Sequence, residues 1–172
     1  MEKKNDFQMV HRARNGDEKA CEVLVKKYYP DIYQYCFLHI YDRYDAEDLT
    51  QEVFVSFFGS LCRYREYGKV KNYLYTIAGN TVKNYYKKKK ALPTEEMPEK
   101  VRENMEDIGI RMDIEQAVKK LPEEIGEVAI LYFFQEFKQK EIGELLHIKL
   151  SLVKYRIGRA KELLSKDLEE MK

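Results

Sequence analysis

A short acidic stretch in the N-terminal half carries the side chains best suited to bind a partner. Its acid and amide groups belong to Asp45, Asp48, Gln51 and Glu52. Apolar residues at Leu49, Val53 and Phe57 recur every four positions, which predicts one face of a helix. Asp45 is placed to act as the N-cap of that helix. The helix therefore has an apolar side for its own domain and an acidic side that is either solvated or bound to a partner.

A catalytic or metal-binding use of the same carboxylates, together with Glu47, is an alternative. Carboxylate metal sites in helical proteins typically add a Glu-x-x-His motif, and we expect none in this chain. The three histidines are far apart in the sequence, and the three cysteines form no Cys-x-x-Cys pair. We therefore expect no metal, no cofactor and no catalytic residue, and we predict that the protein is not an enzyme.

The segment that follows the acidic stretch is strongly basic and contains several tyrosines. Residues 63–90 hold nine lysines and arginines against one acid, Glu66. The net charge of +1 hides this asymmetry, because residues 1–90 hold 17 basic and 12 acidic residues whereas residues 91–112 hold 3 and 6. An acidic helix followed by a basic one indicates two partners, a basic protein surface and then nucleic acid.

Neither a signal core at the N-terminus nor an apolar run of about 20 residues is present. Together with the unpaired cysteines, this predicts a soluble, cytoplasmic protein without a membrane segment of its own.

Apolar spacing of three and four residues predicts an all-α fold of two small helical domains. Pro30 is expected to end a helix or to mark a restart. Two prolines, lost periodicity and an acidic shift over residues 91–109 predict a flexible acidic linker between domains at 1–90 and 110–172. The expected helices cover about residues 6–14, 17–30, 32–40, 45–61, 71–87, 110–121, 122–135, 139–146 and 150–168.

The last two expected helices, joined by a turn at residues 147–149, form a helix-turn-helix pattern, whose second helix enters the major groove of DNA. No acidic residue occurs between Lys149 and Lys161. Arg159 is suited to read a guanine, and its neighbours to read bases or hold phosphates. The alternative is a plain helical hairpin with a solvated basic face. The candidate DNA-contacting residues are Ser151, Lys154, Tyr155, Arg156 and Arg159.

Several runs of residues, in the right order, resemble the bacterial RNA polymerase sigma factors of the extracytoplasmic-function type. They are D-A-E-D-L-T-Q-E-V-F at 45–54, Y-L-Y-T-I-A-G-N at 73–80, L-P at 121–122, E-I-G-E-L-L at 141–146 and V-K-Y-R-I-G-R-A at 153–160. The resemblance extends from about residue 7 to residue 166. It implies an alternative sigma factor that binds core RNA polymerase, recognises and melts promoter DNA, and is regulated by an anti-sigma factor.

The resemblance also implies roles for individual residues. The acidic helix would bind the polymerase clamp, and the helix-turn-helix would read the −35 promoter element. Asn80 would read a base flipped from the −10 element, which requires aromatic and polar surface in exchange for lost stacking. The candidates for −10 binding are Tyr64, Tyr67, Tyr73, Asn80, Lys83 and Lys87.

Some residues depart from the family pattern, and other functions remain open. Tyr73 replaces a usual Trp, Gly143 replaces a usual Ala and is expected to loosen its helix, and Ser151 is a possible shifted N-cap of the recognition helix. A stand-alone dimeric helix-turn-helix regulator is the main alternative, although no obvious dimer helix is present. A protein-only adaptor would leave the basic residues 63–90 unexplained.

Overall fold

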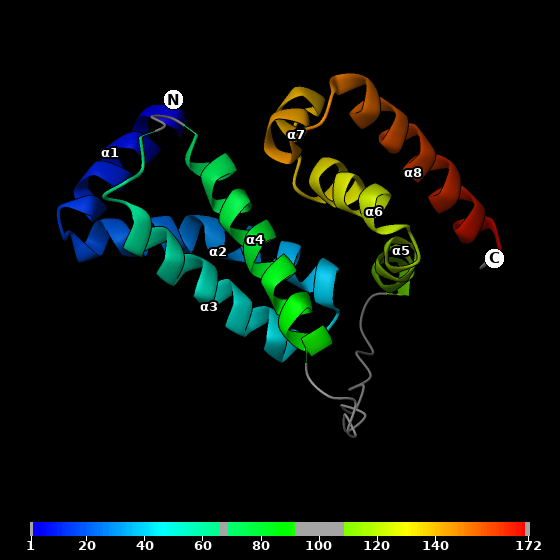
Figure 1. The fold of residues 1–172 in the computed structure, drawn as a ribbon, viewed down its shortest axis with the longest axis horizontal. Helices are drawn as coiled ribbons and strands as arrows, with labels where there is room; N and C mark the ends of the chain where they lie inside the picture. The colour runs from blue at the N-terminus through cyan, green and yellow to red at the C-terminus, as the bar shows by residue number, and fades with distance from the viewer. Residues whose placement is uncertain (1, 66–68, 92–108, 171–172) are drawn as a thin grey trace.

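A computed structural model describes residues 2–65, 69–91 and 109–170 of the 172-residue chain. All regular elements in those ranges are helical, and they form two units that lie side by side, which confirms the predicted fold class (Figure 1). The expected linker lies largely outside the described residues. The elements are α1 (Glu2–Arg14), α2 (Glu18–Ile40), α3 (Arg43–Ser60) and α4 (Val70–Ala91) in the first unit, and α5 (Gly109–Lys119), α6 (Glu123–Ala129), η1 (Ile130–Phe134), α7 (Gln139–Leu146) and α8 (Leu150–Glu170) in the second.

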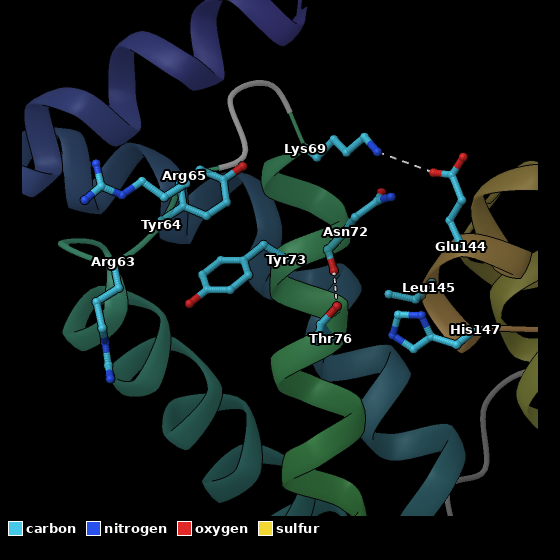
Figure 2. Close-up of a pocket in the computed structure, with 10 residues that line it drawn as sticks. All are labelled: Arg63, Tyr64, Arg65, Lys69, Asn72, Tyr73, Thr76, Glu144, Leu145 and His147. Carbon is cyan, nitrogen blue, oxygen red and sulfur yellow. Dashed lines mark hydrogen bonds and ion pairs between the residues drawn. The ribbon is translucent and has the colours of Figure 1, made fainter.

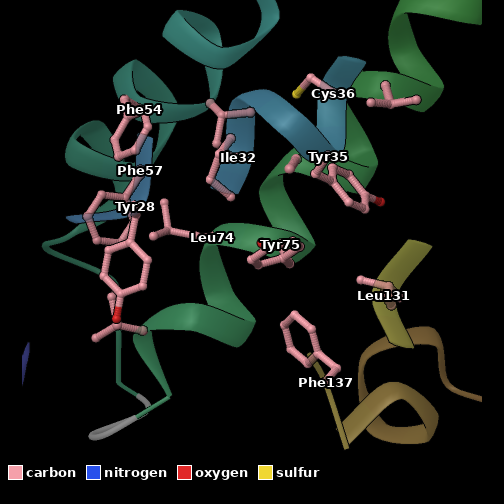
Figure 3. Packing of buried hydrophobic residues seen from close by; sticks show 14 of the residues in the cluster. Tyr28, Ile32, Tyr35, Cys36, Phe54, Phe57, Leu74, Tyr75, Leu131 and Phe137 are labelled. Atoms are coloured by element: carbon pink, nitrogen blue, oxygen red, sulfur yellow. The ribbon is translucent and has the colours of Figure 1, made fainter. Parts of the chain in front are cut away.

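The core of the first unit forms where α2, α3 and α4 meet (Figure 3). Leu24 and Ile32 of α2, Phe57 of α3 and Leu74 of α4 are all fully buried there. Burial of each such side chain contributes about 1.5–3 kcal/mol. The apolar faces predicted for α3 and α4 therefore do point inward, and this fixes which of their residues remain available to solvent.

Pro30 lies inside α2, so the prediction of a break at this position was wrong. A proline in a helix removes one backbone hydrogen bond and costs about 3 kcal/mol. However, Leu24, Tyr28, Ile32 and Tyr35 are all buried on the inner side of the same helix. Their combined burial exceeds the cost of the lost bond, so one helix of 23 residues persists.

The second unit contains the predicted helix-turn-helix, formed by α7 and α8. His147 ends α7 in the left-handed conformation with φ of 55°, and the Ile148 amide donates to the Gly143 carbonyl at 3.0 Å. A Cβ at position 143 would lie 3.0 Å from the Ile148 carbonyl oxygen, so glycine suits this tight turn rather than merely loosening the helix. The Lys149 carbonyl accepts the first bonds of α8, which makes Ser151 a residue of the first turn and not its N-cap.

The helix predicted over residues 122–135 is divided into two parts. Pro122 precedes α6 as its N-cap residue, and α6 ends at Ala129. The chain then widens into one turn of π-helix, in which the Gln135 amide donates to the Ile130 carbonyl at 3.1 Å. Glu136 follows with a left-handed φ of 55°. This irregular turn directs Gln135 toward the first unit, and such π-turns are frequent at functional sites.

Candidate protein and nucleic-acid interfaces

The outer face of α3 is acidic and open to solvent. Asp48, Gln51 and Glu52 are exposed, whereas Leu49 and Val53 on the opposite face are buried. The amphipathic arrangement predicted for this helix is therefore present, and its carboxylates are placed to meet a basic partner surface.

Asp45 is neither the N-cap of α3 nor fully exposed on this face, although the sequence predicted both. The N-cap of α3 is Asp42, whose carboxylate accepts a hydrogen bond from the Asp45 amide at 2.9 Å. Asp45 itself lies in the first turn, half-buried, and its carboxylate accepts the Tyr85 hydroxyl at 2.5 Å. Two aspartates three residues apart both fit the capping preference, and the helix begins at the earlier one. Asp45 thus joins α3 to α4.

Two exposed apolar side chains extend the acidic face and were missed by the sequence reasoning. Tyr44 and Val55 are 69% and 73% exposed, which is unusual for side chains of their size. With Asp48 and Gln51 they follow a spacing of four, three and four residues, which places all four on one stripe of the helix. That spacing was readable in the sequence. A partner of mixed basic and apolar character fits this stripe.

A basic stripe runs along the exposed side of α4. Asn80, Lys83 and Lys87 are all exposed, at the four- and three-residue spacing of one helix face, with Thr76 one turn before them. Leu74, in contrast, faces the core. Ammonium and amide groups in a row of this kind match the phosphates and base edges of a nucleic acid.

The tyrosines proposed to stack on bases are differently placed. Tyr64 is buried, and its ring lies 4.8 Å from that of Tyr73. The Tyr73 hydroxyl donates to Ser60 Oγ at 2.7 Å. In this conformation the two rings pack on each other and on α3, so Tyr64 offers no free stacking face. Tyr67 lies outside the described residues.

A pocket of about 440 Å³ is lined both by this tyrosine pair and by residues of α7 and the turn after it (Figure 2). Arg63, Arg65 and Lys69 line it from the first unit, and Glu144 and His147 line it from the second. Lys69 Nζ lies 3.4 Å from Glu144 Oε2, with both side chains about half exposed. The pocket is therefore basic on one side, and the second unit supplies a carboxylate to it.

The outer face of α8 carries four of the five residues predicted for it. Ser151, Lys154, Tyr155 and Arg159 are exposed, and Arg159 pairs at 2.7 Å with Glu162 of the same helix. Arg156 differs, because it is half-buried and pairs with Glu124 of α6. Its guanidinium is therefore already engaged within the second unit.

No group of three or more histidine, cysteine or acidic side chains in the described residues is arranged to hold a metal ion. Glu144 and His147 do have Glu-x-x-His spacing, which the sequence reasoning overlooked. Both side chains are exposed, and Glu144 contacts Lys69. Among the described helices, none is both long and apolar enough to cross a membrane.

Comparisons with known proteins match both units. Residues 24–92 match the family model described as Sigma-70 region 2, and residues 111–164 match Sigma-70, region 4. The chain is 29% identical to the ECF RNA polymerase sigma factor SigW of Bacillus subtilis, over 94% of this chain and 96% of SigW. It is 27% identical to the RNA polymerase sigma-H factor of Pseudomonas aeruginosa, over 96% of this chain and 95% of that protein.

Solved structures share the fold. CnrH, solved in complex with the cytosolic domain of CnrY, has a TM-score of 0.74 and 21% identity, and the similarity covers 96% of this chain and 98% of CnrH. The sigma factor RpoE of Bartonella quintana, solved with the anti-sigma factor NepR, has a TM-score of 0.71 and 17% identity, over 86% of this chain and 96% of RpoE.

Proposed function

Because this chain belongs to the sigma-70 family of RNA polymerase sigma factors, we propose that it is an alternative sigma factor of the extracytoplasmic-function type. In this role it binds core RNA polymerase and directs promoter recognition, DNA melting and transcription initiation. It acts in the cytoplasm, where polymerase and promoters are, and has no catalytic activity of its own. The observation that carries the proposal is the order of the two matched regions along the chain, each with a charged exposed face of the sign that its partner requires.

The proposed roles divide along the chain at the predicted boundaries. Residues 1–90 bind the polymerase and the −10 element, residues 91–109 connect the domains, and residues 110–172 bind the −35 element. The stripe on α3 meets a basic polymerase surface through Asp48, Gln51 and Glu52. The α4 stripe and the α8 outer face then take the two stretches of promoter DNA.

An anti-sigma factor is a further proposed partner. RpoE of Bartonella quintana, which has this fold, was solved bound to the anti-sigma factor NepR. A protein that covers the exposed stripe of α3 or the α8 face would prevent the chain from binding polymerase or DNA.

The test is reconstitution of the purified chain with bacterial core RNA polymerase, followed by run-off transcription on a promoter library. We expect complex formation and new transcription start sites that share −10 and −35 sequences. Absence of binding to core polymerase, together with tight binding to palindromic duplex DNA, would instead establish the dimeric helix-turn-helix regulator.

A further inference from the structure

Two large apolar side chains lie exposed on the outer face of α8. Leu152 is 37% exposed and Tyr155 is 65% exposed. The packing of this part of the helix is made by Val153 and Ile157, which are buried on its inner side. Leu152 has no charge and no hydrogen-bonding group in its side chain. Phosphate binding and hydrogen bonding to bases therefore give no reason for a leucine at this position of the recognition helix.

Leu152 and Tyr155 share one stripe of α8 with Arg159. The three residues follow a spacing of three and then four positions, at which side chains of a helix are neighbours. The stripe begins in the first turn, because the Lys149 carbonyl accepts the amides of Leu152 and Val153 at 2.9 and 3.1 Å. In helix-turn-helix proteins the N-terminal residues of the second helix contact base edges. The two apolar side chains therefore occupy the part of α8 that lies deepest in the groove.

The surroundings of this apolar pair are basic. Lys149, Lys154 and Lys161 are exposed, and no acidic residue occurs between the first and the last of them. The helix packs on α5, α6 and α7, and it lies on the side of the second unit that is remote from α3 (Figure 1). A partner that fits this face must be acidic and must also offer apolar groups between its charges. Duplex DNA does so, because phosphates flank the major groove and the 5-methyl group of thymine projects into it.

A protein partner fits the same face less well. A stable protein interface uses about 20–30 residues on each side, and the centre of such an interface is depleted in charged residues. Here two apolar side chains lie among cations of a single sign. The charge and the small apolar area therefore favour DNA as the occupant.

We propose that Leu152 and Tyr155 recognise thymine in the −35 element by packing against its 5-methyl group, beside the base pair that Arg159 contacts. The assignment rests on the proposed function, and it adds to that function the kind of base pair that this face selects. Along the helix axis the two side chains are about 4.5 Å apart, since each residue rises about 1.5 Å. This separation is close to the step of about 3.4 Å between base pairs, so the pair serves one thymine or two adjacent ones.

The first experiment removes the methyl group from the DNA and leaves the protein intact. Holoenzyme is reconstituted from the full-length chain and core polymerase, and is bound to a promoter obtained from the run-off library. Each −35 thymine is replaced in turn by deoxyuridine, which differs only in lacking the 5-methyl group. We expect one or two positions at which affinity falls about fourfold, the value of one buried methyl group. Equal affinity at every position, or a −35 element without thymine, would overturn the methyl contact.

The second experiment identifies the side chain that makes the contact. Leu152→Ala is compared with Leu150→Ala, a matched control because Leu150 is also exposed but lies two residues earlier, on roughly the opposite side of the helix. We expect Leu152→Ala to bind the thymine and uracil promoters equally, whereas Leu150→Ala keeps the fourfold ratio. The ratio compares two DNAs on one protein preparation, so partial unfolding of a variant does not change it. Loss of the ratio in both variants, or in neither, would overturn the assignment of Leu152.

Tyr155 is tested in the same way with two substitutions. Tyr155→Phe keeps the ring and should keep the loss of affinity on uracil, whereas Tyr155→Ala removes the ring and should abolish that loss at its own thymine. If Tyr155→Phe abolishes it as well, the hydroxyl makes the contact and the assignment of the ring is wrong.

These measurements separate the inference from the proposed function. A holoenzyme that forms no promoter complex would overturn the proposed function, and the methyl contact with it. A holoenzyme that binds and transcribes the promoter, but binds its thymine and uracil forms equally, would leave the sigma-factor function standing and overturn the methyl contact alone.

Discussion

The exposed face of α3 and the contact between α2 and α6 both depend on carboxylates, but they use them in opposite ways. Asp48 and Glu52 face solvent, and no ion pair within the described part of the chain involves either. Glu127 is half-buried and is bonded to both Tyr35 and His39. An acidic residue is therefore available to an outside partner only where the fold has not already supplied a partner for it.

The same contrast is repeated on the recognition helix. Arg159 is exposed and pairs with a neighbour on its own helix, whereas Arg156 is held between helices by Glu124. Only the first arginine is free to reach a base edge without breaking a contact between elements. Variants of the exposed residues are therefore expected to lose binding, and variants of the residues held between helices are expected to lose stability.

The largest effect is expected on the exposed side, at Asp48. Asp48→Arg replaces an attraction to a basic polymerase surface by a repulsion, so affinity for core polymerase should fall at least about 100-fold. The free energy of unfolding should change by less than about 0.5 kcal/mol, because the side chain is exposed. Affinity is measured by titration with fluorescent core polymerase, and stability by urea denaturation.

The matched control is Glu22→Arg, which makes the same change of charge at an exposed position of α2. It should leave the affinity nearly unchanged. An Asp48→Arg variant that binds core polymerase as tightly as the wild type would remove α3 from the proposed polymerase interface.

Arg159→Ala is expected to cost about 1–3 kcal/mol of promoter discrimination if this arginine reads a base. The loss should concentrate on promoters that differ at one −35 position, as measured by competitive run-off transcription. A uniform loss on all promoters would instead make Arg159 a phosphate contact. Arg156→Ala provides the comparison, because it should also lower the stability of the second unit by removing its contact with Glu124.

Helical spacing in the sequence was sufficient to predict most of the architecture and the exposure of most proposed site residues. Val153 and Ile157 are buried as expected, and Lys154 and Tyr155 are exposed. This succeeds because a helix repeats every 3.6 residues, so the position of a few apolar residues determines the direction of the others. The binding roles themselves stay predictions.

Features that depend on contacts distant in sequence were not predictable. Pro30 was misread because the local rule for proline ignores the burial of the surrounding helix. Tyr64 was predicted to stack on a base, but its side chain is buried beside Tyr73, and this packing has no sequence signal. The bonds of Glu127 and Gln135 join residues 60 to 101 positions apart, and no periodic pattern links such pairs.

Tyr75→Phe tests the buried contact between the two units. The change removes the hydroxyl that donates to Gln135 and leaves a buried amide oxygen without that donor, at a cost of about 1–2 kcal/mol in the free energy of unfolding. Urea denaturation checks the change, with Tyr155→Phe as the exposed control, which should have no effect. If Tyr75→Phe is as stable as the wild type, the hydrogen bond from Tyr75 to Gln135 contributes nothing to the free energy of unfolding.

The smallest effect is expected from pH. The pKa of His39 is raised by Glu127 against the opposing effect of burial, so its contribution to stability is fully present below its ordinary value of 6.5 and is lost as pH rises through the raised value. The lowered pKa of Glu127 contributes stability that is present above 4.5 and is lost as pH falls through the lowered value. Glu123 adds to the shift at His39, and Lys83 adds to the shift at Glu127.

The contact between the units through His39 and Glu127 should therefore be strongest between about pH 4.5 and 6.5 and should weaken above pH 6.5. Urea denaturation at a series of pH values measures the slope on the alkaline side. His39→Gln keeps a donor for Glu127 but does not titrate, so its slope above pH 6.5 should be shallower than that of the wild type. Identical slopes would show that the His39–Glu127 pair is not charged in the folded protein. The role proposed for the exposed carboxylates of α3 does not depend on this result.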